Sequence, residues 1–298
     1  MAFDLQNFAE TSEAVQFSDL DFDEFDRQPL DADTLRVLRY MCDVEYHTSC
    51  YLRDLLVTRS HRKDDVNGFM TTWNREEFWH GEALAAVLKR HDITVDYDEL
   101  KAKRVKLGWS EALGSSKQSA LSNLVGDDFI AVHMTWGAAN ELSAVAAYRR
   151  LAEMMDHPTL SPLLQPIAQQ ETRHVAFYTT QARAALERSP KAQKLVRTIT
   201  TAAWRPVGSS IMGDVGVVRR PVHALATDLR CTLGRDARVA GELLDRLATL
   251  GPENTEPRQD VVVRLQPHTL RVDPHEDVRH QRLVRLLLDV DDIELVVL

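Results

Sequence analysis

Two short stretches of the chain decide the fold: WNREEFWHG at residues 73–81 and QQETRH at residues 169–174. Each stretch holds a glutamate followed three residues later by a histidine, Glu77 with His80 and Glu171 with His174. Side chains three apart on a helix share one face, with Cβ atoms about 5–6 Å apart, so each pair can reach one metal ion. A single such pair is also common on exposed helices. The surrounding pattern must therefore decide whether these pairs are metal ligands or ordinary surface residues.

A second pair of glutamates completes a repeated pattern. Each stretch is preceded by a predicted helix with a lone glutamate, and the offset between the halves is nearly constant: 141 − 45 = 96, 171 − 77 = 94 and 174 − 80 = 94. A constant offset indicates a duplicated helix pair. Four carboxylates and two imidazoles in a bundle core are the ligand set of di-iron and di-manganese carboxylate proteins. The predicted metal ligands are Glu45, Glu77, His80, Glu141, Glu171 and His174.

The glutamates interrupt helix faces that are otherwise apolar. Glu141, for example, lies among Trp136, Leu142 and Val145. Four buried carboxylates would cost much free energy without compensating charge, and two divalent cations would supply that charge. Oxygen ligands with one nitrogen per metal suit iron or manganese better than metals that prefer sulfur. We therefore expect two iron ions, with manganese as the alternative, and no catalytic side chains beyond the metal ligands.

Hydrophobic periodicity and capping residues predict an all-α chain. Four long helices are expected from Asp31 or Asp33 to about residue 59 and at about 66–91, 127–155 and 160–188. The connection at 92–127 is much longer than the other two. A helix pair, a long crossover and a second pair give the ferritin-like form of the four-helix bundle.

The remaining segments define the expected domain limits. Residues 1–30 form an acidic arm, which we interpret as a solvated, flexible tail rather than a binding segment. The di-metal bundle is expected at 31–210, and 211–251 is predicted to form accessory C-terminal helices. Residues 252–298 mix strand-like and helical composition, and their structure and role stay open.

Composition restricts the class of protein. The 298 residues carry 36 Lys and Arg against 45 Asp and Glu, a net charge of −9. Nucleic-acid binders usually carry a basic excess, so we expect no nucleic-acid partner. No apolar run approaches the roughly 18 residues that span a bilayer, the first residues lack a signal-peptide pattern, and the three cysteines suggest no disulfide framework. These features predict a cytoplasmic protein without a membrane partner.

The two decisive stretches resemble motifs of the soluble acyl-acyl-carrier-protein desaturases, a family of the ferritin-like di-iron superfamily. Residues 73–81 are similar to the second-helix motif of that family, a tryptophan followed by EExxHG. Residues 169–174 are similar to its fourth-helix motif, including the arginine before the histidine. VEYH at 44–47 and ANEL at 139–142 match the lone-glutamate helices more loosely. The resemblance covers about residues 32–190.

The resemblance implies a function. A di-iron site would use O2 and electrons from ferredoxin to remove two hydrogens from an acyl chain carried by acyl carrier protein. Glu77 and Glu171 would be the candidates to bridge the two metals. A homodimer is also expected from the resemblance.

The sequence departs from that family at two positions. The family has threonine where this chain has Ala144, and an acid where it has Gln170, a change that we expect to alter the surroundings of His174. Because of these changes a hydroxylase or N-oxygenase acting on a small metabolite is the second hypothesis. A non-catalytic iron-binding protein is the third.

One basic run stands out in the acidic chain. Lys101-Ala-Lys-Arg-Val-Lys106 carries four positive charges within six residues. Acyl carrier proteins and ferredoxins are typically acidic, so this run is a candidate docking patch. A solvated helix face is the simpler alternative.

Overall fold

The computed structural model describes residues 3–96, 98 and 114–203. Every regular element among these residues is helical, which confirms the prediction of an all-α chain. The candidate docking run at 101–106, the accessory helices expected at 211–251 and the tail at 252–298 lie outside the described residues. Within the described ranges, no helix is both long and apolar enough to cross a membrane.

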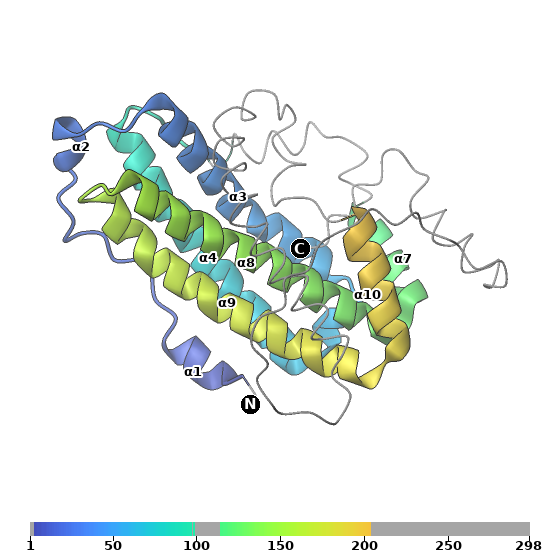
Figure 1. Cartoon of the computed structure of the whole chain (residues 1–298). Coiled ribbons are helices and arrows are strands. Elements are labelled where there is room, and N and C mark those ends of the chain that lie inside the picture. The colour runs from blue at the N-terminus through green and yellow to red at the C-terminus, as the bar shows by residue number, and fades with distance from the viewer. Residues whose placement is uncertain (1–2, 97, 99–113, 204–298) are drawn as a thin grey trace, which may run out of the picture. The chain divides into compact units, whose positions relative to one another are not determined.

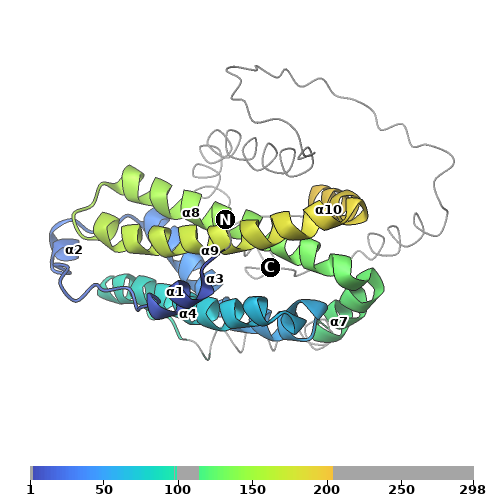
Figure 2. The same cartoon turned by 90° about the horizontal axis from the view of Figure 1, so that it is seen from below.

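Four long helices form two antiparallel pairs (Figure 1). Their bounds are α3 at Ala32–Leu56, α4 at Asp64–Arg90, α8 at Phe129–Met155 and α9 at Leu160–Arg188. Helix α3 packs along α4, and α8 packs along α9. Figure 2 shows the two pairs as two layers. The four helices begin and end within a few residues of the predicted limits, an arrangement compatible with a helical bundle.

Local chemistry explains where the helices begin and end. The carboxylate of Asp31 accepts hydrogen bonds from the backbone N–H groups of Asp33 and Thr34, which caps the first turn of α3. At the end of α8, Asp156 adopts a left-handed conformation with φ of 41°. That conformation stops the helix and turns the chain into α9, because aspartate tolerates it better than most residues.

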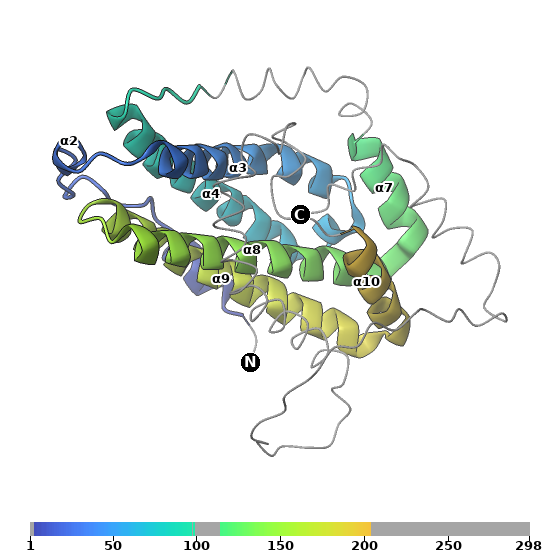
Figure 3. The same cartoon turned by 45° about the horizontal axis from the view of Figure 1, so that its top comes forward.

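Shorter helices complete the described chain. Helices α7 (Gly114–Val125) and α10 (Pro190–Ala203) lie at the same end of the bundle, where α7 contacts α3 and α10 contacts α8 and α9 (Figure 3). The 3-10 turns η1 (Arg59–Arg62) and η2 (Gly126–Asp128) connect neighbouring helices. Helix α10 falls within residues 31–210, the range expected for the bundle.

The N-terminal arm differs from its prediction. Helices α1 (Leu5–Glu10) and α2 (Glu24–Arg27) flank an irregular segment, and the aromatic rings of Phe8 and Phe25 are both buried in the core. The hydroxyl of Thr159 donates to the backbone carbonyl of Asp21 at 2.7 Å. The prediction of a solvated arm is wrong, because scattered apolar residues between the acids anchor the segment on the bundle.

Buried apolar side chains form two clusters, one toward each end of the bundle. The first includes Leu38, Leu84 and Ile167, and the second includes Phe69 and Tyr178. Their separation leaves a central layer of the bundle for polar side chains.

Each helix pair has one point of very close approach. A Cβ atom added to Gly81 of α4 would lie 2.8 Å from the ring of Tyr46 on α3. A Cβ atom added to Gly137 of α8 would lie 2.3 Å from Cε1 of Tyr178 on α9. Because no larger residue fits at these separations, the two glycines set the spacing of the helices beside the central layer.

We predict that Gly137→Ala lowers the free energy of unfolding by about 1–3 kcal/mol, because the added methyl forces the buried Tyr178 ring or the α8 backbone to move. Urea unfolding followed by circular dichroism measures the change.

Gly68→Ala is the matched control, since its Cβ would meet only the flexible end of Leu5 at 3.2 Å. That variant should range from unchanged to about 1 kcal/mol more stable, through better helix propensity. Equal stability of Gly137→Ala and the unsubstituted protein would contradict the packing argument.

Candidate metal centre

A buried polar layer separates the two apolar clusters. Along α4 the clustered apolar residues stop at Trp73 and resume at Ala83, and along α9 they stop at Ala168 and resume at Phe177. The six predicted metal ligands lie in this layer, and each has less than a tenth of its surface exposed. Ionisable groups in such a position are rarely left without partners or a metal.

The structure brings all six residues together in two overlapping groups. The first group comprises Glu45, Glu77, His80 and Glu171, and the second comprises Glu77, Glu141, Glu171 and His174. In each group, one oxygen or nitrogen from every residue lies within 4.8 Å of the others. Two residues, Glu77 and Glu171, belong to both groups. The cluster can hold a metal ion.

Both histidines turn the same ring nitrogen toward the carboxylates. Nδ1 of His80 lies 3.3 Å from Oε1 of Glu171 and 3.9 Å from Oε2 of Glu45. Nδ1 of His174 lies 3.1 Å from an oxygen of Glu77 and 3.1 Å from an oxygen of Glu171. The two Nδ1 atoms are therefore the nitrogens available to metals.

Atoms inside the cluster fit a bound cation. Oε1 of Glu77, Nδ1 of His80 and Oε1 of Glu171 are fully buried and make no hydrogen bond to any described residue. Buried polar atoms without a hydrogen bond are costly and uncommon in folded proteins. Metal coordination would satisfy all three atoms, which are of the types that bind iron and manganese.

The second nitrogen of His174 is held by a carboxylate from the other helix pair. Nε2 of His174 lies 2.7 Å from Oε2 of Glu76, and the other oxygen of Glu76 accepts from Arg173 at 2.5 Å. Burial alone would raise the pKa of Glu76, but the hydrogen bond from His174 and the charges of His174 and Arg173 outweigh burial and lower that pKa. Glu76 is therefore ionised, and it orients the imidazole of His174.

The second nitrogen of His80 meets an amide instead. Nε2 of His80 lies 2.7 Å from Oε1 of Gln170, and the amide nitrogen of Gln170 donates to the backbone carbonyl of Glu13 at 2.8 Å. The sequence-based prediction that Gln170 affects His174 is wrong. The side chains just before Glu77 and Glu171 reach across the bundle, so Gln170 contacts the histidine of the opposite pair.

Tyr148 is a site residue that the sequence reasoning missed. Its buried hydroxyl donates to Oε1 of Glu45, which leaves Oε2 of that carboxylate to face the cluster. Burial and the neighbouring charge of Glu45 raise the pKa of Tyr148 well above its ordinary value. The phenol therefore stays a hydrogen-bond donor. The sequence did carry one signal for this residue. Tyr148 follows Glu141 by seven residues, a spacing that places both side chains on the same face of a helix.

The hydroxyl beside Ala144, that of Ser143, is used within its own helix. Ala144, where the resembled family has threonine, is partly buried against the apolar core. The hydroxyl of Ser143 donates to the backbone carbonyl of Ala139 at 2.8 Å. One turn after Ala144, the hydroxyl of Tyr148 donates to the carboxylate of a candidate ligand, Glu45.

Burial and mutual repulsion dominate the ionisation of the glutamates. Burial, followed by the charge of Glu171, raises the pKa of Glu77 and of Glu141 well above the ordinary value. The same two causes raise the pKa of Glu45. Glu171 behaves oppositely, because the hydrogen bond from His174 and the positive charges of the neighbouring His174 and His80 outweigh burial and lower its pKa. Three carboxyl groups therefore tend to hold protons and one is ionised.

The histidines complete this charge balance. Burial disfavours the charged imidazole of His174, but its hydrogen bonds to Glu141, Glu171 and Glu76 outweigh burial and raise its pKa well above the ordinary value. The neighbouring Glu171 raises the pKa of His80 in the same way against burial. Without a cation, protons supply the positive charge that the cluster needs, and a metal would displace them.

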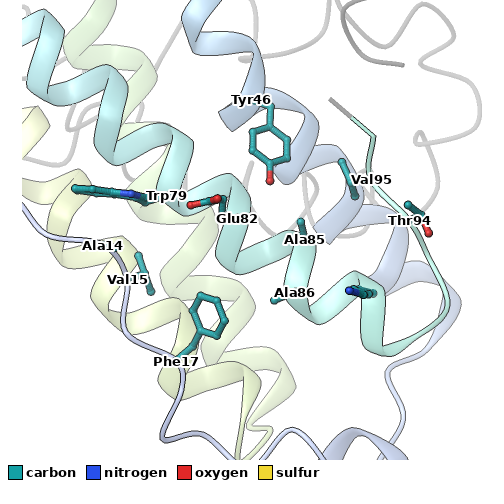
Figure 4. A pocket seen from close by; sticks show the side chains of 11 residues that line it. Ala14, Val15, Phe17, Tyr46, Trp79, Glu82, Ala85, Ala86, Thr94 and Val95 are labelled. Atoms are coloured by element: carbon teal, nitrogen blue, oxygen red, sulfur yellow. The ribbon is translucent and has the colours of Figure 1, made fainter. Parts of the chain in front are cut away.

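A separate pocket lies on the outer side of α4 (Figure 4). Its volume is about 630 Å³, and none of the six candidate ligands lines it. The walls come from the N-terminal arm, α3, α4 and the segment that follows α4. They are formed by Ala14, Val15, Phe17, Tyr46, Trp79, Glu82, Ala85, Ala86, Lys89, Thr94 and Val95.

Comparison with known proteins adds no relative, because no protein-family model, curated protein or solved structure matches the chain. The geometry of the cluster and the sequence motifs are therefore the basis for a functional proposal.

We predict that the metal-free protein becomes less stable as pH rises. The pKa values of Glu77, Glu141 and His174 are raised in the folded state, so their stabilising effect is present at low pH and lost as pH rises. Between about pH 6 and pH 8 the melting temperature after chelation should fall by about 5 °C or more. The lowered pKa of Glu171 acts oppositely, but in the acidic range.

Differential scanning calorimetry of chelator-treated protein measures this change. Stabilisation by added Mn²⁺ should grow over the same interval, because the metal no longer competes with protons. Glu141→Gln removes one titrating group and should flatten the dependence. A melting temperature of the metal-free protein that rises or stays constant with pH would refute the charge balance.

Proposed function

We propose that this protein is a di-iron oxidase with a ferritin-like bundle, related in mechanism to the acyl-acyl-carrier-protein desaturases. The observation that carries the proposal is the pair of four-residue ligand groups that share Glu77 and Glu171. A carboxylate that bridges two adjacent metals must be a ligand of both, and Glu77 and Glu171 would meet this requirement. The order of a helix pair, a long connection and a second helix pair supports the ferritin-like arrangement.

The donor set supports iron as the metal. Each group offers three carboxylates and one imidazole, and no cysteine belongs to either. Hard oxygen donors with one nitrogen favour iron or manganese, and iron is the metal that couples O2 reduction to oxidation of unactivated C–H bonds. Three buried residues would position the ligands: Tyr148 holds one oxygen of Glu45, Glu76 orients His174, and Gln170 orients His80.

The proposed reaction is desaturation of an acyl chain bound to acyl carrier protein. In the balanced reaction, –CH2–CH2–, O2, two electrons and two protons give –CH=CH– and two water molecules. Ferredoxin would deliver the electrons. The pocket beside α4 does not bear on the substrate, because none of the six candidate ligands lines it.

A second candidate function is hydroxylation or N-oxygenation of a small metabolite. Two observations favour it: the position of the family's threonine is occupied by Ala144, and Gln170 provides an amide behind His80 where the family has an acid. The same metal centre would serve this reaction, and the product would retain one oxygen atom from O2.

Metal analysis tests the centre itself. Purified protein should contain about two Fe or Mn ions per chain, and Glu77→Ala or Glu171→Ala should lose at least half of that content, because each removes a ligand shared by both positions. Glu187→Ala, an exposed position on α9, is the matched control and should retain the metal. Unchanged metal content in both ligand variants would refute the assignment.

Mass spectrometry tests the reaction. Iron-loaded protein is incubated with acyl carrier protein substrates, reduced ferredoxin and O2. Desaturation lowers the product mass by two hydrogens, whereas hydroxylation adds one oxygen. The metal-free protein serves as the control and should leave the substrate unchanged. An unchanged substrate mass across acyl chain lengths, with iron-loaded protein that consumes O2, would contradict the acyl-chain assignment.

A further inference from the structure

The two candidate metal positions offer equal sets of direct ligands. Each comprises three carboxylates and one imidazole, and two of the carboxylates are common to both. Apart from its histidine, each position has one ligand of its own. This ligand is Glu45 of α3 at the His80 position and Glu141 of α8 at the His174 position. A difference in affinity between the positions must therefore come from the groups behind these ligands.

Behind His174 stands a charged acceptor. The carboxylate of Glu76 is fully buried, accepts from Nε2 of His174 at 2.7 Å and is held by Arg173. A carboxylate that attracts the N–H proton of an imidazole increases the electron density on the other ring nitrogen. Nδ1 of His174 is thereby made a stronger metal donor.

Behind His80 stands a neutral acceptor at the corresponding position. The carbonyl of Glu13 can only accept a hydrogen bond, so the NH2 group of Gln170 must face it and the amide oxygen must face His80. Nε2 of His80 is therefore the protonated nitrogen, and Nδ1 keeps the lone pair for a metal. The amide fixes the tautomer of His80 but adds no negative charge behind it.

Glu45, the carboxylate that belongs only to the His80 position, is also made a weaker metal donor. The hydroxyl of Tyr148 donates to Oε1 of Glu45 and withdraws electron density from that carboxylate. Both groups behind the His80 position, Gln170 and Tyr148, are therefore neutral, whereas the His174 position is supported by a buried carboxylate.

We propose that the two metal positions have unequal affinities, with the His174 position binding first and tightly and the His80 position binding weakly, because a neutral amide stands behind His80 and a carboxylate behind His174. Gln170 is a positioning residue in this proposal, which rests on the metal centre proposed above. Changes of a group that orients a metal-bound histidine typically alter metal affinity by about 10–100-fold, which sets the expected size of the difference.

Titration of the chelator-treated full-length chain with Mn²⁺ tests the proposal. Electron paramagnetic resonance of the free aqueous ion measures how much Mn²⁺ remains unbound at each addition. Two neighbouring cations repel each other and separate the binding steps in any two-metal site. The decisive quantity is therefore how each dissociation constant changes among the variants.

Two substitutions act in different ways on the two steps. Gln170→Glu should tighten the second step by about 10–100-fold and leave the first within a few-fold. Glu76→Gln should weaken the first step by a similar factor and leave the second nearly unchanged. Gln169→Glu adds the same charge at an exposed neighbouring position on α9 and is the matched control, which should leave both steps unchanged.

The outcomes separate this proposal from the metal centre. Two Mn²⁺ ions bound with no response of the second step to Gln170→Glu, beyond that of Gln169→Glu, would leave the centre in place and overturn the inequality. Weakening of the second step rather than the first by Glu76→Gln would also overturn it. Failure of the unsubstituted protein to bind any Mn²⁺ or Fe²⁺ would overturn the metal centre and this proposal together.

Discussion

The structure depends on the burial of four carboxylates and two imidazoles between two apolar clusters. Water cannot stabilise charge at such a depth, and the opposing glutamates repel one another. The repulsion is relieved by positive charge, from shared protons or from metal ions. The rest of the bundle holds these groups in place: glycines bring the helices of each pair together, and buried phenol, amide and carboxylate groups fix the orientation of individual ligands.

The central layer and its ligands could be predicted from the sequence because their signals are local. Spacing of three residues places Glu77 and His80 on one face of α4, and the repeated offset identifies the second half. The groups behind the ligands could not be predicted in the same way. Whether Gln170 meets His80 or His174 depends on how α4 and α9 lie against each other, and helix periodicity carries no information on that pairing.

The N-terminal arm illustrates a different limit of sequence reasoning. The acidic composition of the arm led to the prediction of a solvated tail, although Phe8 and Val15 are buried. Helix α1 is only six residues long and the segment after it is irregular, so these apolar residues show no helical periodicity over a longer stretch. Tertiary contacts decide its structure. The backbone carbonyl of Glu13 accepts a hydrogen bond from Gln170, whose amide oxygen contacts His80. A segment that was predicted to be a tail therefore contributes to the surroundings of the candidate centre.

The crossed contacts behind the histidines have a consequence for the symmetry of the bundle. Each ligand group draws residues from both helix pairs, and each histidine is held by a side chain of the opposite pair. Neither helix pair contains a complete candidate ligand group. Two identical hairpins related by a twofold axis would form two identical spheres. Because both hairpins belong to one polypeptide, their sequences need not be identical, and Glu76 and Gln170 are matching positions at which the two halves differ in charge.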